Sequence, residues 1–406
     1  MKEQFESIKS DEKINTRTER IGYIALFTGV YFLFMPFDLV SLGRIGTILR
    51  MLALLPLIAI ALNYDKCTFN SKEALPIVLY AVYKQLSIVY SVFPTFTDVE
   101  APRIAANFAL ILIVGSFYHL NSKEIDFLKM SLAAAGFITI ALILIYADFS
   151  GAGRLTIRMS SEEVDQNYLI GYLMFILPFS IDRLLKKKRY LSVLPVIIVC
   201  VLIIMTGSRG GLLAALAVIA ISGCGIVKEN WNSLKKYTIP ILITIGGSLI
   251  VLVFVLQYLN PEVLERFSLS YVEQNGTTGR KDIWLYFIKL FLESTPFRQF
   301  WGYGAGVSAF MNRMNTRMAG HVAHNLWVDE LVTGGVIGLA LLLTIHFTFM
   351  MVAIKCKDMY VVSAFVGFMI MCANLSIVSY KPMWNCMILI MLINKNRKMQ
   401  LRRGAI

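Results

Sequence analysis

The chain has 406 residues, of which 57 % are hydrophobic and 16 % are charged. This composition excludes an ordinary water-soluble domain and indicates a polytopic membrane protein. The formal net charge is +13, but the basic residues form short clusters between apolar runs, as they do in cytoplasmic loops. The charge therefore predicts orientation in a membrane, and we expect the lipid bilayer but no nucleic acid among the partners.

Apolar runs recur from residue 21 to residue 394. Most are long enough to cross a hydrocarbon core of roughly 30 Å as a helix. The expected spans are 21–41, 45–63, 74–93, 104–119, 127–147, 166–181, 191–206, 210–227, 237–258, 326–353, 359–380 and 382–394. They predict an all-α fold, a polytopic membrane helical bundle of about 12 transmembrane helices.

A single transmembrane domain, residues 21–394, is expected between two cytoplasmic tails, residues 1–20 and the basic residues 395–406. Basic clusters after the sixth and eighth spans lie inside when both termini are cytoplasmic. Residues 259–325 then form one large extracytoplasmic loop. The first apolar run lacks a small-residue cleavage site, which predicts an uncleaved anchor in the cytoplasmic (inner) membrane.

Within the large loop, residues 281–293 have the pattern of an amphipathic helix. Asp282, Tyr286 and Lys289 fall on one face, whereas apolar side chains such as Phe287 fall on the other. The helix is too short to cross the membrane, so we expect it to lie in the membrane interface with its apolar side down. Packing on the top of the bundle is the alternative.

Two arginines are candidates for binding an anion. Arg209 stands in a glycine-rich turn between two apolar spans, where a charge needs a water-filled cavity or an anionic partner. Arg280 stands at the start of the loop helix, and with Arg209 it could clamp a diphosphate because a guanidinium forks onto phosphate oxygens. The alternatives are an arginine that snorkels to the interface and an exposed arginine at a helix start.

The pair His324-Asn325 lies where the large loop returns to apolar sequence, and Gly335 and Gly338 follow it. A histidine at a membrane surface can take or give a proton near neutral pH. Asp329 and Glu330 follow closely, and a carboxylate can orient a histidine. The glycines allow the next helix to pack closely. Although another histidine lies three residues earlier, we expect no metal because no third ligand is evident.

Asp165 and Asn167 open the sixth span from the outer side, after a loop that contains Arg154 and Arg158. These polar groups could line a sugar-binding mouth. Asp and Asn also favour helix starts, so a helix cap is an equal alternative.

Lys84 is the clearest charge deep inside an expected span. A charged residue within the membrane is a candidate for a functional site. A lysine paired with a carboxylate for helix packing is the other interpretation.

Together these segments resemble the superfamily of O-antigen ligases and O-antigen polymerases, bacterial membrane enzymes of glycan assembly. His324-Asn325 with Gly335 and Gly338 is similar to the family's signature after its large outer loop. The turn at Arg209 and the segment from Arg280 to Trp284 are similar to its two arginine segments. Asp165-Gln166-Asn167 and the glycine-rich residues 302–306 also look like family segments.

The resemblance implies metal-independent glycosyl transfer without a cofactor on the outer membrane face, from a polyprenyl-diphosphate-linked oligosaccharide. Arg209 and Arg280 would hold the leaving diphosphate, and His324 would remove the proton from the attacking hydroxyl. Gly335 and Gly338 would be structural. The candidate substrate-binding residues are Asn325, Asp165, Asn167, Arg154, Arg158, Trp284 and Glu330.

We favour a polymerase that joins repeat units into O-antigen, capsular or exopolysaccharide. A ligase that transfers the glycan to a lipid A core is the alternative, and transfer to protein is a third. A chain-length regulator and a flippase are candidate partners. A transporter is less consistent with the sequence, because alternating access predicts related halves and polar residues near the middle of the membrane.

Overall fold

The structure, a computed structural model, describes most of the chain. The described residues are 21–39, 51–69, 71–149, 153–159, 162–186, 193–230, 261–268, 270–271, 280–308, 322–376, 378 and 380–402. These residues are mostly helical, which confirms the helical character predicted from the apolar runs.

The first half of the chain contains helices of very different length. They are α2 (Tyr23–Leu33), η1 (Met35–Leu39), α4 (Leu54–Ala61), η2 (Tyr64–Lys66), α5 (Ser71–Tyr90), α6 (Pro94–Gly115), α7 (Ser122–Tyr146), α8 (Gln166–Leu173), α9 (Ile176–Lys186), α10 (Val193–Met205) and α11 (Arg209–Asn230). The second half contains α13 (Pro261–Glu265), α15 (Arg280–Leu292), α16 (Pro296–Trp301), α18 (Leu326–Thr333), α19 (Gly335–Lys355), α20 (Met359–Cys372) and α21 (Lys381–Arg402).

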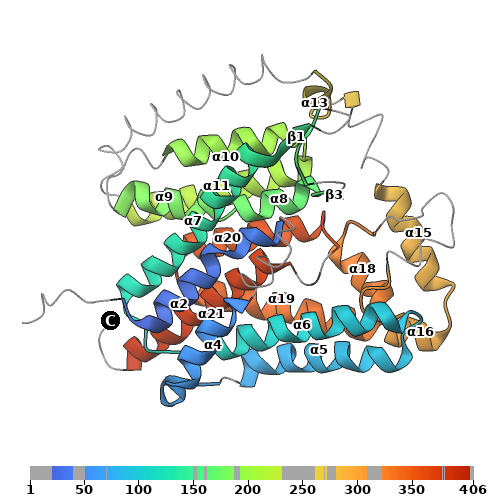
Figure 1. Ribbon diagram of the computed structural model, residues 1–406, viewed down its shortest axis with the longest axis horizontal. Helices are drawn as coiled ribbons and strands as arrows, with labels where there is room; N and C mark the ends of the chain where they lie inside the picture. Colours follow the sequence, from blue (N-terminus) through green and yellow to red (C-terminus); the bar gives the residue numbers. More distant parts are fainter. Residues whose placement is uncertain are drawn as a thin grey trace, which may run out of the picture.

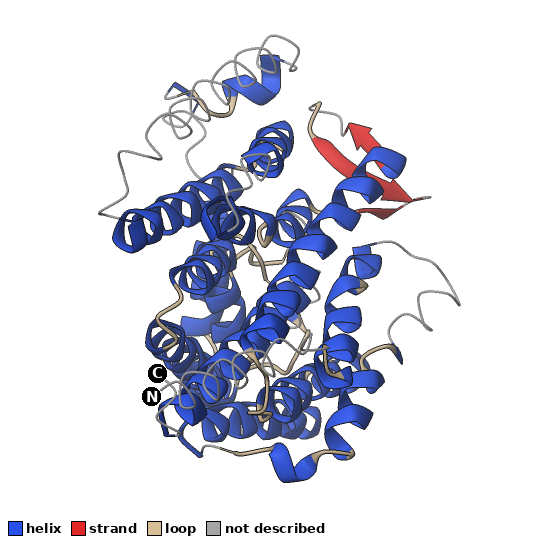
Figure 2. Ribbon diagram, turned by 90° about the vertical axis from the view of Figure 1, so that its left-hand side faces the viewer, coloured by secondary structure: helices blue, strands red, loops and turns tan. Residues whose placement is uncertain are grey.

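The helices form a bundle around one large apolar core. Helix α11 packs on α20, α5 packs on α6 and α19, and α21 packs on α6. Figures 1 and 2 show the long helices side by side, with α15, α16 and α18 gathered toward one end of the bundle, at the right of Figure 1. That end also carries the strands and α13. The segments selected from the sequence therefore meet at one end of the bundle.

Among the described residues, three helices are long and apolar enough to cross a membrane: Ser122–Tyr146, Arg209–Lys228 and Gly335–Lys355. Shorter apolar helices cover Tyr23–Leu39, Val193–Met205 and Met359–Cys372. The described residues thus support an integral membrane protein, whereas the expected number of about 12 spans is not confirmed. The expected span 237–258 lies outside the described residues.

Two expected spans are each divided into two helices. The span expected at 166–181 is divided into α8 and α9. The span expected at 326–353 is divided into α18 and α19, because Gly335 has φ 61°, a left-handed conformation that a continuous helix does not contain. The apolar pattern alone could not detect these breaks.

The described residues also contain one short segment of strands, which the all-α prediction did not include. Strands β1 (Ala147–Phe149), β2 (Leu155–Met159) and β3 (Glu162–Glu163) form a small antiparallel sheet in the order β1-β2-β3. The β-branched residues Thr156 and Ile157 favour extended backbone, and both are fully buried. This sheet leads directly into the start of α8.

The loop helix α15 packs on the protein through its apolar face. Phe287 is fully buried against Ala323 and Val332 of the segment that contains α18. This packing agrees with the alternative of a helix packed on the bundle, whereas a position in the membrane interface is not confirmed. Leu285 and Leu292 on α15 remain exposed.

Helix α21 continues beyond the expected start of the C-terminal tail, up to Arg402. The carboxylate of Glu73 holds this end of the helix, because Asn394 Nδ2 donates to Glu73 Oε1 at 3.0 Å and Lys398 Nζ lies 3.0 Å from the same oxygen. Lys395 is buried and donates to the carbonyl of Thr68. Residues 395–402 are therefore helical, and Lys395 is part of the packed bundle.

Candidate functional site

The turn between α10 and α11 holds the first arginine. Gly207 has φ 63°, which favours glycine. Ser208 Oγ accepts a hydrogen bond from the N–H of Gly211 at 3.1 Å and so caps the first turn of α11. The same hydroxyl donates to Asn167 Oδ1 at 2.6 Å. Arg209, the first residue of α11, is thereby fixed next to the start of α8.

Two further arginines lie against this turn. Arg154 Nε donates to the carbonyl of Thr206 at 2.8 Å, and Arg266 Nε donates to the carbonyl of Gly207 at 3.3 Å. Carbonyls at the C-terminal end of a helix lack partners within the helix and carry partial negative charge. The end of α10 therefore gathers two guanidinium groups beside Arg209.

An aromatic ring lies near two of these arginines. The guanidinium carbons of Arg209 and Arg266 lie 5.9 and 6.0 Å from the centroid of the Tyr271 ring. A cation at this distance from a tyrosine ring is stabilised by the ring quadrupole. Tyr271 thus helps to hold two like charges near each other.

Arg280 completes this group from the start of α15. Its Nη1 donates to Asn374 Oδ1. Burial lowers the pKa of the Arg280 guanidinium, the carboxylate of Asp165 opposes this shift, and the charges of Arg209 and Arg266 add to it. We call Arg154, Arg209, Arg266 and Arg280 the arginine cluster. A bound anion would relieve the mutual repulsion within it.

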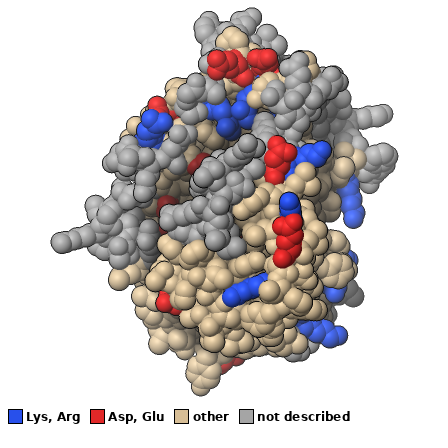
Figure 3. Space-filling model, turned by 90° about the vertical axis from the view of Figure 1, so that its right-hand side faces the viewer, with Lys and Arg blue, Asp and Glu red and all other residues tan. Residues whose placement is uncertain are grey.

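The surface at this end of the molecule shows the same charge distribution. Figure 3 views the face on the side of α13 and α15, where basic side chains gather near acidic ones in the upper part. Below it, uncharged residues cover most of the surface that is not grey, with single charged side chains between them.

The backbone just before His324 is held from two sides. Trp284 Nε1 of α15 donates to the carbonyl of Ala323 at 2.9 Å. The carboxylate of Asp329 accepts hydrogen bonds from the backbone N–H of Ala323 and from the side chain of Ser308. His324 itself is half-buried and has φ 49°, in the left-handed region. These contacts fix the position of the backbone from which the His324 side chain extends.

Asn325 has a local structural role. Its side-chain oxygen accepts hydrogen bonds from the N–H groups of Trp327 at 3.0 Å and Val328 at 3.1 Å, and thus caps α18. Its own N–H donates to Ser376 Oγ at 3.2 Å. Asn325 therefore starts α18 immediately after His324, and a role in binding substrate stays a prediction.

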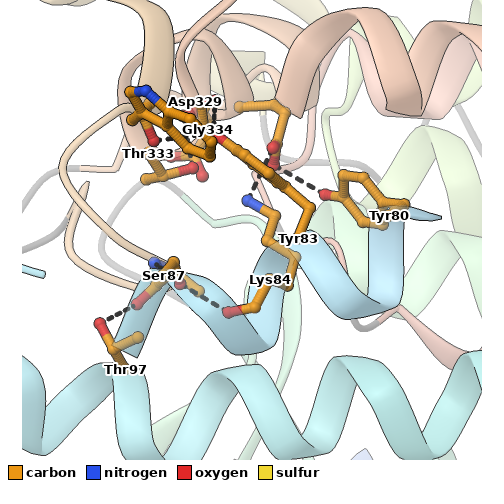
Figure 4. Close-up of polar contacts among 11 residues, drawn as sticks. Tyr80, Tyr83, Lys84, Ser87, Thr97, Asp329, Thr333 and Gly334 are labelled. Carbon is orange, nitrogen blue, oxygen red and sulfur yellow. Dashed lines mark hydrogen bonds and ion pairs between the residues drawn. The ribbon is translucent and has the colours of Figure 1, made fainter. Parts of the chain in front are cut away.

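Glu330 forms a fully buried ion pair inside the bundle. Its Oε1 lies 2.6 Å from Lys84 Nζ, and the side chains are 0 % and 1 % exposed. Tyr80 donates its hydroxyl to Glu330 Oε2 at 2.8 Å. Figure 4 shows Tyr80, Tyr83 and Lys84 of α5 pointing toward the segment with Asp329, Thr333 and Gly334. Of the two interpretations of Lys84, the structure thus shows the packing pair, and Glu330 ties α18 to α5.

The glycine-rich residues 302–306 pass between α5 and α18. The N–H groups of Tyr303 and Gly304 donate to the carbonyls of Val332 and Thr333, each at 3.0 Å. The N–H of Ala305 donates to Ser87 Oγ at 3.3 Å, on the side of α5 shown in Figure 4. This segment therefore joins the end of α18 to α5.

The glycines after α18 make room for close contacts. A Cβ on Gly335 would lie 2.4 Å from the carbonyl oxygen of Phe300. A Cβ on Gly338 would lie 2.3 Å from Glu330 Oε1, the oxygen that pairs with Lys84. Gly335 thus permits the break between two helices, whereas Gly338 leaves space for the buried carboxylate.

We expect Gly335→Ala to lower the free energy of unfolding by at least about 2 kcal/mol, because alanine is strained at positive φ and its Cβ has no space. The measurement is the midpoint of thermal unfolding in detergent. Gly223→Ala in α11 is the matched control, since a Cβ there meets nothing within 4 Å. A Gly335→Ala protein as stable as this control would contradict the argument.

The segment before α8 contains the helix cap that was one of the two alternatives for Asp165 and Asn167. Asp165 Oδ1 accepts a hydrogen bond from the N–H of Asn167 at 2.7 Å, so Asp165 is the cap of α8. Asn167 is buried and bonded to Ser208. Arg158 Nε lies 2.7 Å from Asp148 Oδ2 across β1 and β2. No described contact joins Arg158 to the arginine cluster, whereas Arg154 belongs to it.

Sequence reasoning missed Arg266, Tyr271, Asn374 and Ser376. The first two lie within residues 259–325 without a recognisable motif, and the others lie near the end of the apolar run that predicts a span at 359–380. Asn374 and Ser376 are polar residues near the end of apolar sequence, which is a signal for a functional site in membrane proteins.

Among the described residues, no group of three or more His, Cys, Asp and Glu could hold a metal ion.

One family model agrees with the resemblance seen in the sequence. The family model described as O-antigen ligase matches residues 194–343, which include Arg209, Arg280, His324-Asn325, Gly335 and Gly338. None of the curated proteins matches the chain. One solved chain, from "Structural coordination of polymerization and crosslinking by a peptidoglycan synthase complex", is 12 % identical over 81 % of this chain and 98 % of that chain, with a TM-score of 0.43.

Proposed function

We propose, from the chain's resemblance to the superfamily of O-antigen ligases and polymerases, that it is a membrane glycosyltransferase that uses a polyprenyl-diphosphate-linked oligosaccharide. The favoured reaction is polymerisation of repeat units on the outer face of the cytoplasmic membrane, with both termini inside. The observation that carries the proposal is the arginine cluster, four guanidinium groups gathered around the turn between α10 and α11.

In the proposed reaction, a hydroxyl of the acceptor sugar attacks the anomeric carbon of the donor. The bond between that carbon and the diphosphate oxygen breaks, and the electron pair leaves with the diphosphate. Arg209 and Arg280 stabilise the negative charge that develops on it, with Arg154 and Arg266 nearby. His324 takes the proton from the attacking hydroxyl. The activated donor supplies the driving force, so the proposed reaction needs no nucleotide, and in this proposal the arginines stabilise the leaving diphosphate without a metal.

The start of α11 adds to this charge stabilisation. Backbone N–H groups at a helix start carry partial positive charge and favour anions. Arg209 is the first residue of α11, and the hydroxyl of Ser208 accepts a hydrogen bond from the N–H of Gly211. A diphosphate beside this helix start would meet the helix dipole and the guanidinium groups together.

The ligase reaction uses the same chemistry and differs only in its acceptor, a lipid A core or a protein in place of a second lipid-linked repeat unit. We favour polymerisation because the sequence contains no feature that points to a lipid A core. Substrate contacts of Asn325, Asp165, Asn167, Arg158, Trp284 and Glu330 remain proposals, as do a chain-length regulator and a flippase as partners.

The test is the size profile of lipid-linked glycans in a strain that lacks this gene, resolved by gel and mass spectrometry beside the complemented strain. A polymerase predicts that only single repeat units accumulate on the polyprenyl carrier. Long chains that stay on the carrier and fail to reach their final acceptor would identify a ligase instead. An unchanged profile would rule out both reactions.

A further inference from the structure

The segment between α20 and α21 contacts all three parts of the candidate site. Asn374 bonds to Arg280, Ser376 bonds to Asn325, and Tyr380 bonds to the backbone of α8. These partners lie in separate segments of the sequence. This short connection carries no recognised motif. It fixes the arginine cluster and the segment that contains His324 relative to each other.

Asn374 is placed by contacts on both sides. Its Nδ2 donates to the carbonyl of Ile370 at 3.3 Å, one turn earlier on α20. Its Oδ1 accepts from Arg280 Nη1. A Cβ on Gly210 would lie 2.2 Å from Asn374 Nδ2, so only a glycine at that position leaves room for this amide. Arg280 is thus docked beside the start of α11, where Arg209 lies.

An amide oxygen suits this role because it is neutral. A carboxylate in the place of Asn374 would also accept from Arg280, but it would neutralise the charge that an anionic substrate needs. A neutral acceptor fixes the guanidinium and leaves its full positive charge available. The remaining N–H groups of Arg280 can then be directed at a bound anion.

The same connection reaches the other two parts of the site. Ser376 Oγ accepts the N–H of Asn325, the residue after His324, at 3.2 Å. Tyr380 donates its hydroxyl to the carbonyl of Tyr168 at 2.7 Å, and a Cβ on Gly171 would collide with this hydroxyl. A shift of Asn374 would therefore be restrained by two further anchors within six residues.

We propose that Asn374 is a positioning residue that holds the Arg280 guanidinium toward the diphosphate of the donor. This inference rests on the proposed function. Asn374 does not touch the reacting atoms, and its effect passes through Arg280. Loss of the amide frees the arginine side chain to adopt other rotamers, which weakens its contact with the diphosphate.

The test is a double-mutant cycle on the purified full-length protein. The substrate is the lipid-linked repeat unit isolated from the strain that lacks this gene. We expect Asn374→Ala to lower kcat/KM for the donor at least about tenfold, as for the loss of a hydrogen bond to a charged group. In the Arg280→Ala background the same substitution should change kcat/KM less than about twofold. Equal losses in both backgrounds, or full activity of Asn374→Ala, would overturn the proposal.

A second variant separates positioning from folding. Asn374→Asp keeps the size of the side chain, so the protein is expected to fold. The new carboxylate, however, neutralises the positive charge of the Arg280 guanidinium. Binding of a short-chain polyprenyl diphosphate without sugar should weaken at least about tenfold, and unchanged binding would overturn the proposal. Asn394→Ala is the control, because the Asn394 amide is also hydrogen-bonded, but to Glu73; it should leave this binding unchanged.

The outcomes also separate this inference from the proposed function. If Arg280→Ala keeps wild-type activity, the proposed role of the arginine cluster fails. If Arg280→Ala lowers kcat/KM but keeps measurable activity, and Asn374→Ala lowers it further by the same factor as in the wild type, the proposed function stands and only the positioning role is wrong.

Discussion

His324→Asn is expected to lower the turnover rate of glycan transfer by about 10²- to 10⁴-fold, the range for loss of a general base. Asparagine is chosen because it tolerates the left-handed backbone better than alanine, and His324 has φ 49°. The variant thus removes the imidazole without adding the strain that alanine would bring. Its thermal midpoint in detergent should stay near that of the wild type.

Two further variants sharpen this experiment. His324→Gly also fits the left-handed backbone, and added imidazole should restore part of its activity if the side chain acts only as a base. His119→Asn is the matched control, because His119 is exposed in the connection between α6 and α7. A folded His324→Asn protein with wild-type turnover would remove His324 from the mechanism.

Lys84→Met is expected to lower the free energy of unfolding by about 3–5 kcal/mol, because it leaves the carboxylate of Glu330 buried without its partner. The two side chains are 1 % and 0 % exposed and 2.6 Å apart. The double variant Lys84→Met/Glu330→Gln should recover most of the loss, since it removes both charges and keeps an acceptor for the hydroxyl of Tyr80. The measurement is the thermal midpoint of each variant in the same detergent.

An exposed ion pair supplies the control for this prediction. Lys289 Nζ lies 3.6 Å from Glu293 Oε1 on α15, with side chains 71 % and 65 % exposed. Such pairs contribute less than about 1 kcal/mol because water screens them, so Glu293→Gln should barely change the midpoint. A Lys84→Met protein with the same small change would mean that Glu330 finds another partner or loses its charge.

Much of this protein follows from local sequence. The apolar composition determined a membrane protein, because long apolar segments must be buried in lipid or in other helices. Arg209 and Arg280 could be selected one by one, since each stands at a helix start beside glycine. The special positions of His324 and Gly335 were also visible as a motif, and the structure gives both residues positive φ.

Other features were decided only by the tertiary structure. The partner of Lys84 is Glu330, and the partners of Asn167 and Arg280 are Ser208 and Asn374. These pairs lie far apart in the sequence, so no local pattern relates them. Which carboxylate neutralises a buried lysine, and which amide holds an arginine, depends on how the helices pack and on the cost of leaving a buried polar group unpaired.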